Sequence, residues 1–276
     1  MRAVLTLLFL IPFLSNGQES DDSANTTARL RYYLTAYHQA DETPGSIQPV
    51  ISFVDKLAQK KESFKKDDEF LAYIFQKTHQ RFLSHYEIDA SFGQLLTDRT
   101  YNCLTATALY GVLLDHFGFE YKIIETNYHI FLIARTSQGR VLVETTDPAN
   151  GYVTDPTEID KRIALYRENK IQLDSRNKTY YHFKFDLYNE VNLDQMLGLL
   201  YYNLSVNAYN RQSLPLAIEH LKSAAKLYYS PRIEEFSRII LLSVIEGVQD
   251  EQLKQAYLRK MQALRRDQFR VTASSN

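Results

Sequence analysis

Three side chains in the middle of the chain have the types that thiol catalysis uses. Cys103 is the only cysteine of the 276 residues, and His129 and Asp147 follow it in the sequence. A thiolate attacks carbonyl groups, an imidazole accepts the thiol proton and returns it to a leaving group, and a carboxylate fixes the imidazole tautomer. The three residues therefore indicate a nucleophile, a general base and an orienting acid.

The local sequence predicts how Cys103 is positioned. Asn102 is a favourable helix N-cap and the apolar run that begins at Cys103 stops near Gly118, so we expect a central helix with Cys103 as its first residue. A helix N-terminus favours the thiolate form of a cysteine. The Cys103 N–H would also bind an oxyanion, with a second donor from Asn102, Tyr101 or Gln94.

The register of a β-hairpin decides whether the base meets the acid. Strands rich in β-branched and aromatic residues are expected over residues 121–126, 129–136 and 140–147. A three-residue loop at 137–139, with its glycine in the left-handed position, would pair Thr136 with Arg140. Continuing that pairing places His129 directly opposite Asp147, whereas a loop of another length would move them to opposite faces. Asp155, beyond the following turn, is the alternative acid.

These residues lie in segments that resemble a known family. The segments read Tyr101-Asn-Cys-Leu-Thr-Ala-Thr-Ala-Leu-Tyr, Tyr128-His-Ile-Phe-Leu and Glu144-Thr-Thr-Asp-Pro-Ala-Asn-Gly. In order, spacing and expected secondary structure, residues 65–155 resemble the core of the transglutaminase-like superfamily, within the papain-like thiol fold. The resemblance implies a triad of Cys103, His129 and Asp147 and an acyl-thioester mechanism. Many members carry a Trp near the active site, and its absence from this chain disfavours protein crosslinking.

The sequence predicts a two-part organisation behind a signal peptide. Residues 1–17 have a positive end and an apolar run typical of a secretory signal, so we expect export to a periplasmic or extracellular location after a flexible leader at 18–28. Residues 29–190 would form the α+β domain, in which a central helix packs on an antiparallel sheet. Residues 191–270 have a helical period that resembles tetratricopeptide-like helix pairs, followed by a tail at 271–276. Other expected elements are helices at 47–60, from Asp67 or Asp68, and at 156–169, and a strand at 179–185.

Composition disfavours several classes of function. The chain has 32 Lys plus Arg and 33 Asp plus Glu, so no overall field would attract nucleic acid or anionic lipid. After the signal peptide, no apolar stretch approaches the length of about 20 residues that a membrane helix needs. His79 and His85 would lie on different faces of a helix, and no paired-cysteine or HExxH motif is present, so we expect no metal site.

The hypothesis is an exported enzyme that transfers an acyl group through a thiol. It would act on an amide of a protein or peptide, by hydrolysis or by transfer to an amine, with no cofactor. Its C-terminal helices would support the first domain or bind a protein partner. The alternative is a catalytically silent domain that binds a peptide or protein beside its tyrosine-rich helices.

Overall fold

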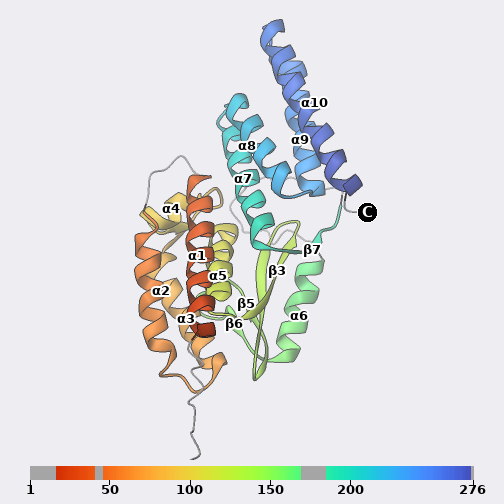
Figure 1. Cartoon of the computed structure of the whole chain (residues 1–276). Helices are drawn as coiled ribbons and strands as arrows, with labels where there is room; N and C mark the ends of the chain where they lie inside the picture. Colours follow the sequence, from red (N-terminus) through yellow and green to blue (C-terminus); the bar gives the residue numbers. More distant parts are fainter. Residues whose placement is uncertain (1–16, 41–45, 169–184, 275–276) are drawn as a thin grey trace, which may run out of the picture.

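A five-stranded antiparallel sheet lies between helices in the part of the chain that the structure describes, residues 17–40, 46–168 and 185–274 (Figure 1). In this computed structural model the strand order is β6-β5-β4-β3-β7. The strands are β3 Glu120–Thr126, β4 Ile130–Thr136, β5 Gly139–Val143, β6 Tyr152–Val153 and β7 Tyr188–Val191. The expected α+β class is confirmed. The proposed signal peptide lies outside the described residues except for Gly17, and the strand expected at 179–185 lies outside them except for Phe185.

Five helices lie on one side of the sheet. They are α1 Gly17–Gln39, α2 Gln48–Lys61, α3 Asp67–Phe82, α4 Phe92–Thr97 and α5 Cys103–His116. A short parallel pair, β1 His85–Tyr86 and β2 Thr100–Tyr101, brackets α4. The expectation that the helices begin after the flexible leader at 18–28 was wrong, because α1 already begins at Gly17. The polar residues of that segment suggested solvent exposure, which does not by itself exclude a helix.

The strands separate two apolar cores because successive side chains point to opposite faces of a sheet. The larger core lies against α5, and the smaller lies against α6 Pro156–Arg167 on the other face (Figure 1). Neighbouring strand residues divide accordingly: Ile123, Leu132 and Val143 belong to the larger core, and Ile124, Phe131 and Leu142 to the smaller. Any side chain of these strands can therefore be assigned to a face by counting.

The register of the β4–β5 hairpin differs from the expected one by a single residue. Thr136 pairs with Gly139 and not with Arg140, so the loop holds two residues, Ser137 and Gln138. Asp67 at the start of α3 accepts hydrogen bonds from the backbone N–H and the hydroxyl of Ser137, at 2.8 and 2.5 Å. This contact from a distant helix holds the shorter loop and could not be seen in the hairpin sequence.

Four further helices follow the sheet: α7 Leu193–Asn210, α8 Leu214–Leu227, α9 Pro231–Gly247 and α10 Glu251–Ser274 (Figure 1). They form the helical region, where the sequence predicted helix pairs. Among the described residues, no helix is long and apolar enough to span a membrane.

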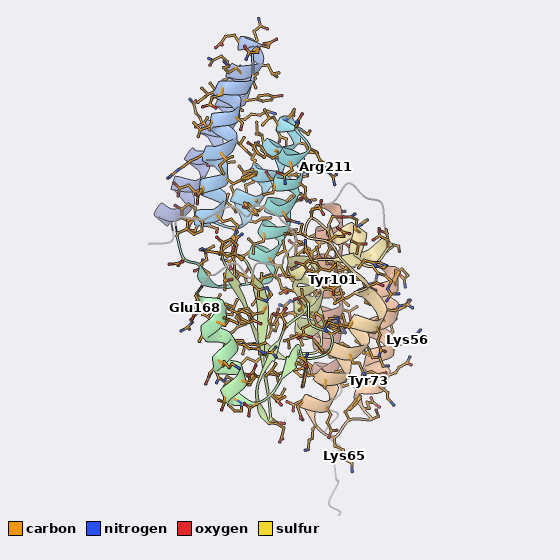
Figure 2. The ribbon with its side chains drawn as sticks, turned by 180° about the vertical axis from the view of Figure 1, so that it is seen from behind. Lys56, Lys65, Tyr73, Tyr101, Glu168 and Arg211 are labelled. Atoms are coloured by element: carbon orange, nitrogen blue, oxygen red, sulfur yellow. The ribbon has the colours of Figure 1, made fainter. Side chains whose placement is uncertain are left out.

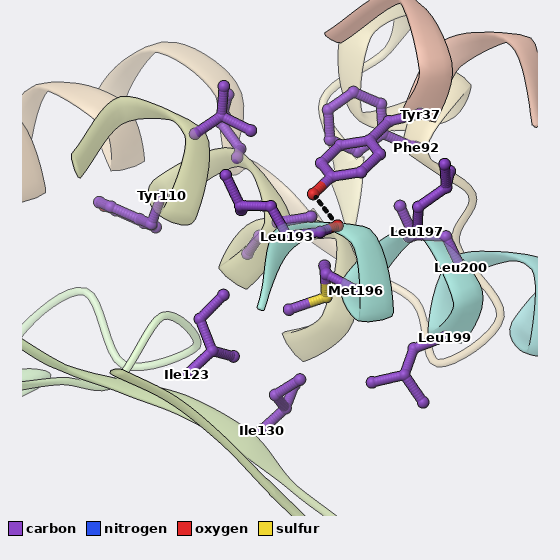
Figure 3. Close-up of a cluster of buried hydrophobic side chains, with 14 of the residues drawn as sticks. Tyr37, Phe92, Tyr110, Ile123, Ile130, Leu193, Met196, Leu197, Leu199 and Leu200 are labelled. Carbon is purple, nitrogen blue, oxygen red and sulfur yellow. Dashed lines mark hydrogen bonds between the residues drawn. The ribbon is translucent and has the colours of Figure 1, made fainter. Parts of the chain in front are cut away.

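The helical region packs on the α+β part, as expected if the C-terminal helices support the first domain. Leu193 and Met196 of α7 belong to the same apolar core as Ile123 and Ile130 of the sheet (Figure 3). The buried hydroxyl of Tyr37, on α1, donates a hydrogen bond to the Leu193 carbonyl at 2.9 Å. The first turn of α7 is therefore part of the central core.

Candidate active site

Cys103 is the first residue of α5, as predicted, and its position is fixed by Asn102. The Asn102 Oδ1 accepts a hydrogen bond from the Thr105 N–H at 2.9 Å, and the Thr105 hydroxyl accepts one from the Asn102 N–H at 3.0 Å. The Asn102 Nδ2 donates to the carbonyls of Ile88 and Ala90, each at 3.0 Å. One amide thus caps the helix and ties its start to the preceding loop. Cys103 itself is partly exposed and packs against the larger core.

His129 lies at the end of the turn that joins β3 to β4. The backbone N–H of Thr126 donates to the His129 carbonyl at 2.8 Å, and the His129 N–H donates to the Thr126 hydroxyl at 3.1 Å. The imidazole lies parallel to the Phe131 ring, with an interplanar angle of 16° and centroids 6.0 Å apart. Tyr166 of α6 covers it with a centroid distance of 4.9 Å. These contacts restrict the imidazole to one orientation.

The carboxylate that meets His129 belongs to Glu144 and not to Asp147. His129 Nε2 forms a short hydrogen bond with Glu144 Oε2. Leu132 pairs with Val143, so continuing the register places Glu144 opposite Phe131 and on the face that His129 shares. The pair is diagonal, which the longer glutamate side chain can bridge.

Asp147 performs a different task. Its Oδ1 accepts hydrogen bonds from the backbone N–H groups of Ala149 and Asn150, at 3.1 and 2.8 Å, and closes the turn after β5. The expectation that it lies directly opposite His129 was wrong, because β5 ends at Val143 and Asp147 lies in the turn that follows the strand. The alternative acid, Asp155, caps α6 by accepting from the Glu158 N–H at 2.8 Å.

Glu144 is held by hydrogen bonds on both oxygens. Its Oε1 accepts from the backbone N–H and the hydroxyl of Thr146, at 3.0 and 2.7 Å, and its Oε2 also accepts from the Tyr166 hydroxyl at 3.1 Å. Glu144 is 5% exposed. A carboxylate this buried needs these donors, because a charge removed from water is otherwise strongly destabilising.

The thiol and the carboxylate both act on the imidazole. Burial alone would lower the pKa of His129, but the Glu144 charge and the hydrogen bonds to Cys103 and Glu144 outweigh it and raise the pKa above its ordinary value. For Glu144, burial alone would raise the pKa, but the His129 charge and the hydrogen bonds from His129 and Thr146 lower it. Because Glu144 faces Nε2, Nδ1 is the ring nitrogen left for the sulfur.

The structure separates the three candidate oxyanion donors. Both Nδ2 hydrogens of Asn102 go to loop carbonyls, so its side chain is a structural cap and the assignment as a donor was wrong. Gln94 uses its Oε1 to accept from the Ser91 N–H at 2.9 Å, which completes the cap of α4. Tyr101, labelled in Figure 2, is buried, and burial and then the Glu144 charge raise its pKa. Both Tyr101 and the Gln94 amide therefore keep a hydrogen that could serve as the second donor.

The sequence contained a signal for Glu144 that the expected register obscured. Glu144 directly follows the apolar residues of β5, and an acid at a buried strand position usually has a partner. A two-residue loop would have assigned it to the His129 face. Tyr166 could not be predicted in the same way, because it reaches the site from α6 through tertiary packing.

The remaining candidate residues concern a metal site. Within the described part of the chain, no group of three or more His, Cys, Asp or Glu side chains is arranged to hold a metal ion. His79 is buried between Phe75 and Tyr110, and desolvation lowers its pKa to about 4.

Compared with known proteins, the chain matches no family model, and no curated protein or solved structure is significantly similar to it.

Proposed function

We propose that this protein is a thiol-dependent acyl-transfer enzyme in which Cys103, His129 and Glu144 act together. The observation that carries the proposal is the His129 imidazole, which is hydrogen-bonded to a fully hydrogen-bonded carboxylate and whose pKa is raised in part by the Cys103 thiol at a helix N-terminus. A histidine with a purely structural role needs only hydrogen-bond partners for its two ring nitrogens. His129 instead lies between a nucleophile and an acid, which is the order that acyl transfer requires. Glu144 replaces Asp147 as the orienting acid.

The reaction follows from these positions. The Cys103 sulfur, after giving its proton to His129, attacks the carbonyl carbon of an amide and forms a tetrahedral oxyanion. When the oxyanion collapses, the carbon–nitrogen bond breaks and the leaving amine takes the proton from His129. The resulting thioester is attacked by water or an amine, whose proton passes to His129, and the Cys103 thiolate leaves. Glu144 stabilises the charged imidazole at each of these steps.

The start of α5 provides the oxyanion contact. Cys103 and Leu104 are the first two residues of the helix, and backbone N–H groups at these positions have no acceptor within a helix. When the sulfur attacks the substrate, the carbonyl oxygen becomes an oxyanion. This oxygen would lie beside the Cys103 N–H and the positive end of the helix. The second donor would be the Tyr101 hydroxyl or the Gln94 side-chain amide.

The wider assignment remains part of the same proposal. We infer a papain-like core of the transglutaminase-like kind, followed by tetratricopeptide-like helices, in a chain exported to a periplasmic or extracellular compartment. Its substrate would be a protein or peptide amide, with no cofactor. The resemblance of the three short sequence segments and the helix–sheet arrangement of Cys103 and His129 support this assignment.

Alkylation of Cys103 by iodoacetamide tests the proposal. We expect the mature protein to react at pH 6.5 faster than a free cysteine, because the imidazole withdraws the thiol proton. His129→Asn should reduce the rate by about 10-fold or more, and Cys103→Ala should abolish labelling. His85→Asn, an exposed histidine, is the matched control and should leave the rate unchanged.

An equal rate in the wild type and in the His129→Asn variant would contradict the proposal and favour a binding domain without catalysis. If alkylation depends on His129 as expected, the substrate can be sought among exported proteins with an acyl-trapping probe, using Cys103→Ala as the control.

A further inference from the structure

A buried ion pair joins the helical region to the turn that carries His129. Arg232, the second residue of α9, donates from Nε to Oε1 of Glu125 at 3.0 Å. The Tyr228 hydroxyl donates to the other oxygen of Glu125 at 2.6 Å. Glu125, which lies one residue before the end of β3, is 2% exposed. The pair is therefore sequestered from water at the point where the strand enters the turn.

The same guanidinium holds the turn itself. Arg232 Nη2 donates to the carbonyls of Thr126 and Asn127, at 2.7 and 3.0 Å. Thr126 pairs through its backbone and hydroxyl with His129, which is the last residue of the same turn. Tyr128 alone thus separates His129 from Asn127, the nearer of the two residues whose carbonyls Arg232 binds.

The guanidinium is itself restrained on its other side. The Cζ atom of Arg232 lies 5.6 Å from the centroid of the Tyr202 ring on α7. Asn189 of β7 donates to the Tyr228 hydroxyl at 3.3 Å, so the edge strand also supports the pair. A planar guanidinium with several donors can satisfy a carboxylate and two carbonyls at once, which a lysine ammonium cannot do in the same geometry.

We propose that Arg232 is a positioning residue that holds the 126–129 turn and thereby aligns the His129 imidazole between Cys103 and Glu144. This inference rests on the proposed function. Proton transfer requires the imidazole within hydrogen-bond reach of the sulfur, and a displacement of about 1 Å can reduce a rate by on the order of 100-fold. The helical region is then part of the active-site scaffold.

A purely structural ion pair would behave differently. It would lower the stability of the protein when broken, but the surviving native molecules would retain the same imidazole environment. A positioning residue instead changes the chemistry of the folded protein. The measurement must therefore report on Cys103 and His129 in molecules that are shown to be folded.

The test compares Arg232→Gln with Arg238→Gln in the full mature chain. Arg238 lies on the same helix and forms a surface pair with Glu234, so it is the matched control. Two quantities are measured below the unfolding transition of each variant: the rate of Cys103 alkylation across pH 5–9, and the titration of the His129 imidazole by NMR. We expect Arg232→Gln to reduce the rate by about 10-fold or more and to move the His129 titration toward about 6.5. Arg238→Gln should change neither.

Milder variants decide the matter if Arg232→Gln does not fold. Arg232→Lys keeps a positive charge near Glu125 but loses the fork, and Tyr228→Phe removes only the hydroxyl that faces Glu125. Both should slow alkylation and shift the His129 titration, by less than Arg232→Gln would. Folded variants with the wild-type rate and titration would overturn the positioning role. A wild-type rate in His129→Asn would instead overturn the proposed function, so the two failures are distinguishable.

Discussion

Glu144 has a set of contacts that an orienting acid requires, and Asp147 has a set that a turn requires. The Glu144 carboxylate faces the imidazole, the Tyr166 hydroxyl and two groups of Thr146. Asp147 accepts instead from two backbone N–H groups of its own turn. Only Glu144 contacts His129. Replacing the Glu144 carboxylate should therefore change the reactivity of Cys103, whereas replacing the Asp147 carboxylate should change mainly the stability of the protein.

Glu144→Gln should reduce Cys103 alkylation at neutral pH by about 10-fold or more, because the amide keeps the size of the side chain but removes the charge that supports the imidazolium. Asp147→Asn should leave the rate within about 2-fold and cost about 1 kcal/mol of stability through the weakened turn. Alkylation kinetics and urea unfolding measure the two effects. A larger loss of rate in Asp147→Asn than in Glu144→Gln would restore Asp147 as the acid.

The same pair predicts a pH dependence of stability. The pKa of His129 is raised to about 10 in the folded protein, so its stabilising contribution is complete below the unfolded pKa of about 6.5 and is lost as pH rises toward 10. The pKa of Glu144 is lowered, so its contribution is lost as pH falls below the ordinary range. The difference in melting temperature between wild type and Glu144→Gln should therefore be greatest near pH 5–6.5 and shrink by pH 10. A difference that grows between pH 7 and 10 would contradict this assignment.

At the residue scale the sequence identified two of the three interacting groups. Cys103 and Asn102 could be predicted because an N-cap followed by an apolar run is a local signal. His129 could be predicted as part of the hairpin, but its acid partner depended on a loop length that Asp67 helps to hold from another helix. The residues of the hairpin favoured a three-residue loop. In the structure the loop has two residues, and Asp67 of α3 binds the first of them, Ser137.

Among the elements, α5 has a start that serves both the helix and the loop before it. Asn102 and Asn192 form the same kind of capping box, on α5 and α7. Asn102 also donates two hydrogen bonds to the carbonyls of Ile88 and Ala90. The difference makes Asn192 a natural control for the additional role of Asn102.

Asn192→Ala should lose about 1 kcal/mol, the ordinary contribution of an N-cap. Asn102→Ala should lose about 1–3 kcal/mol more, because it also leaves two loop carbonyls without their donors. It should slow Cys103 alkylation as well, since the start of the helix is no longer tied to the loop. Urea unfolding and labelling of the native protein measure these effects. Equal losses in the two variants would show that the contacts to Ile88 and Ala90 contribute nothing measurable.

Strands were predicted well where their residues are apolar and poorly where they are not. β3 and β4 contain runs of β-branched and aromatic residues, and their bounds were close to the prediction. β7, at the sheet edge, contains only Tyr188–Val191, with Asn and Glu in the middle. Those types do not favour a strand, so the pairing of β7 with β3 depends on tertiary placement that a sequence pattern does not contain.

On the scale of the whole molecule, the α+β part and the helical region share one apolar core. Gly198 of α7 shows how closely the helices approach, because a Cβ at this position would lie 2.8 Å from Cβ of Tyr228. Met196 and Leu193 extend the same contact into the sheet. A helical period predicted the helices, but not that α7 would complete the core of the preceding part and place Arg232 beside the His129 turn.

This shared core predicts a single cooperative unfolding transition. Far-ultraviolet circular dichroism follows the helices of both parts, while the NMR signals of the His129 imidazole in urea follow the α+β part alone. The two midpoints should coincide, because loss of the helical region would expose apolar side chains of α5 and the sheet. Tyr37→Phe should lower the free energy of unfolding by about 1–2 kcal/mol, since it leaves the buried Leu193 carbonyl without its donor. Both midpoints should then move to lower urea concentration together. Two separate transitions, or a Tyr37→Phe effect on one probe only, would show that the helical region is an independent unit, and Arg232 would then hold the His129 turn only while that unit stays folded.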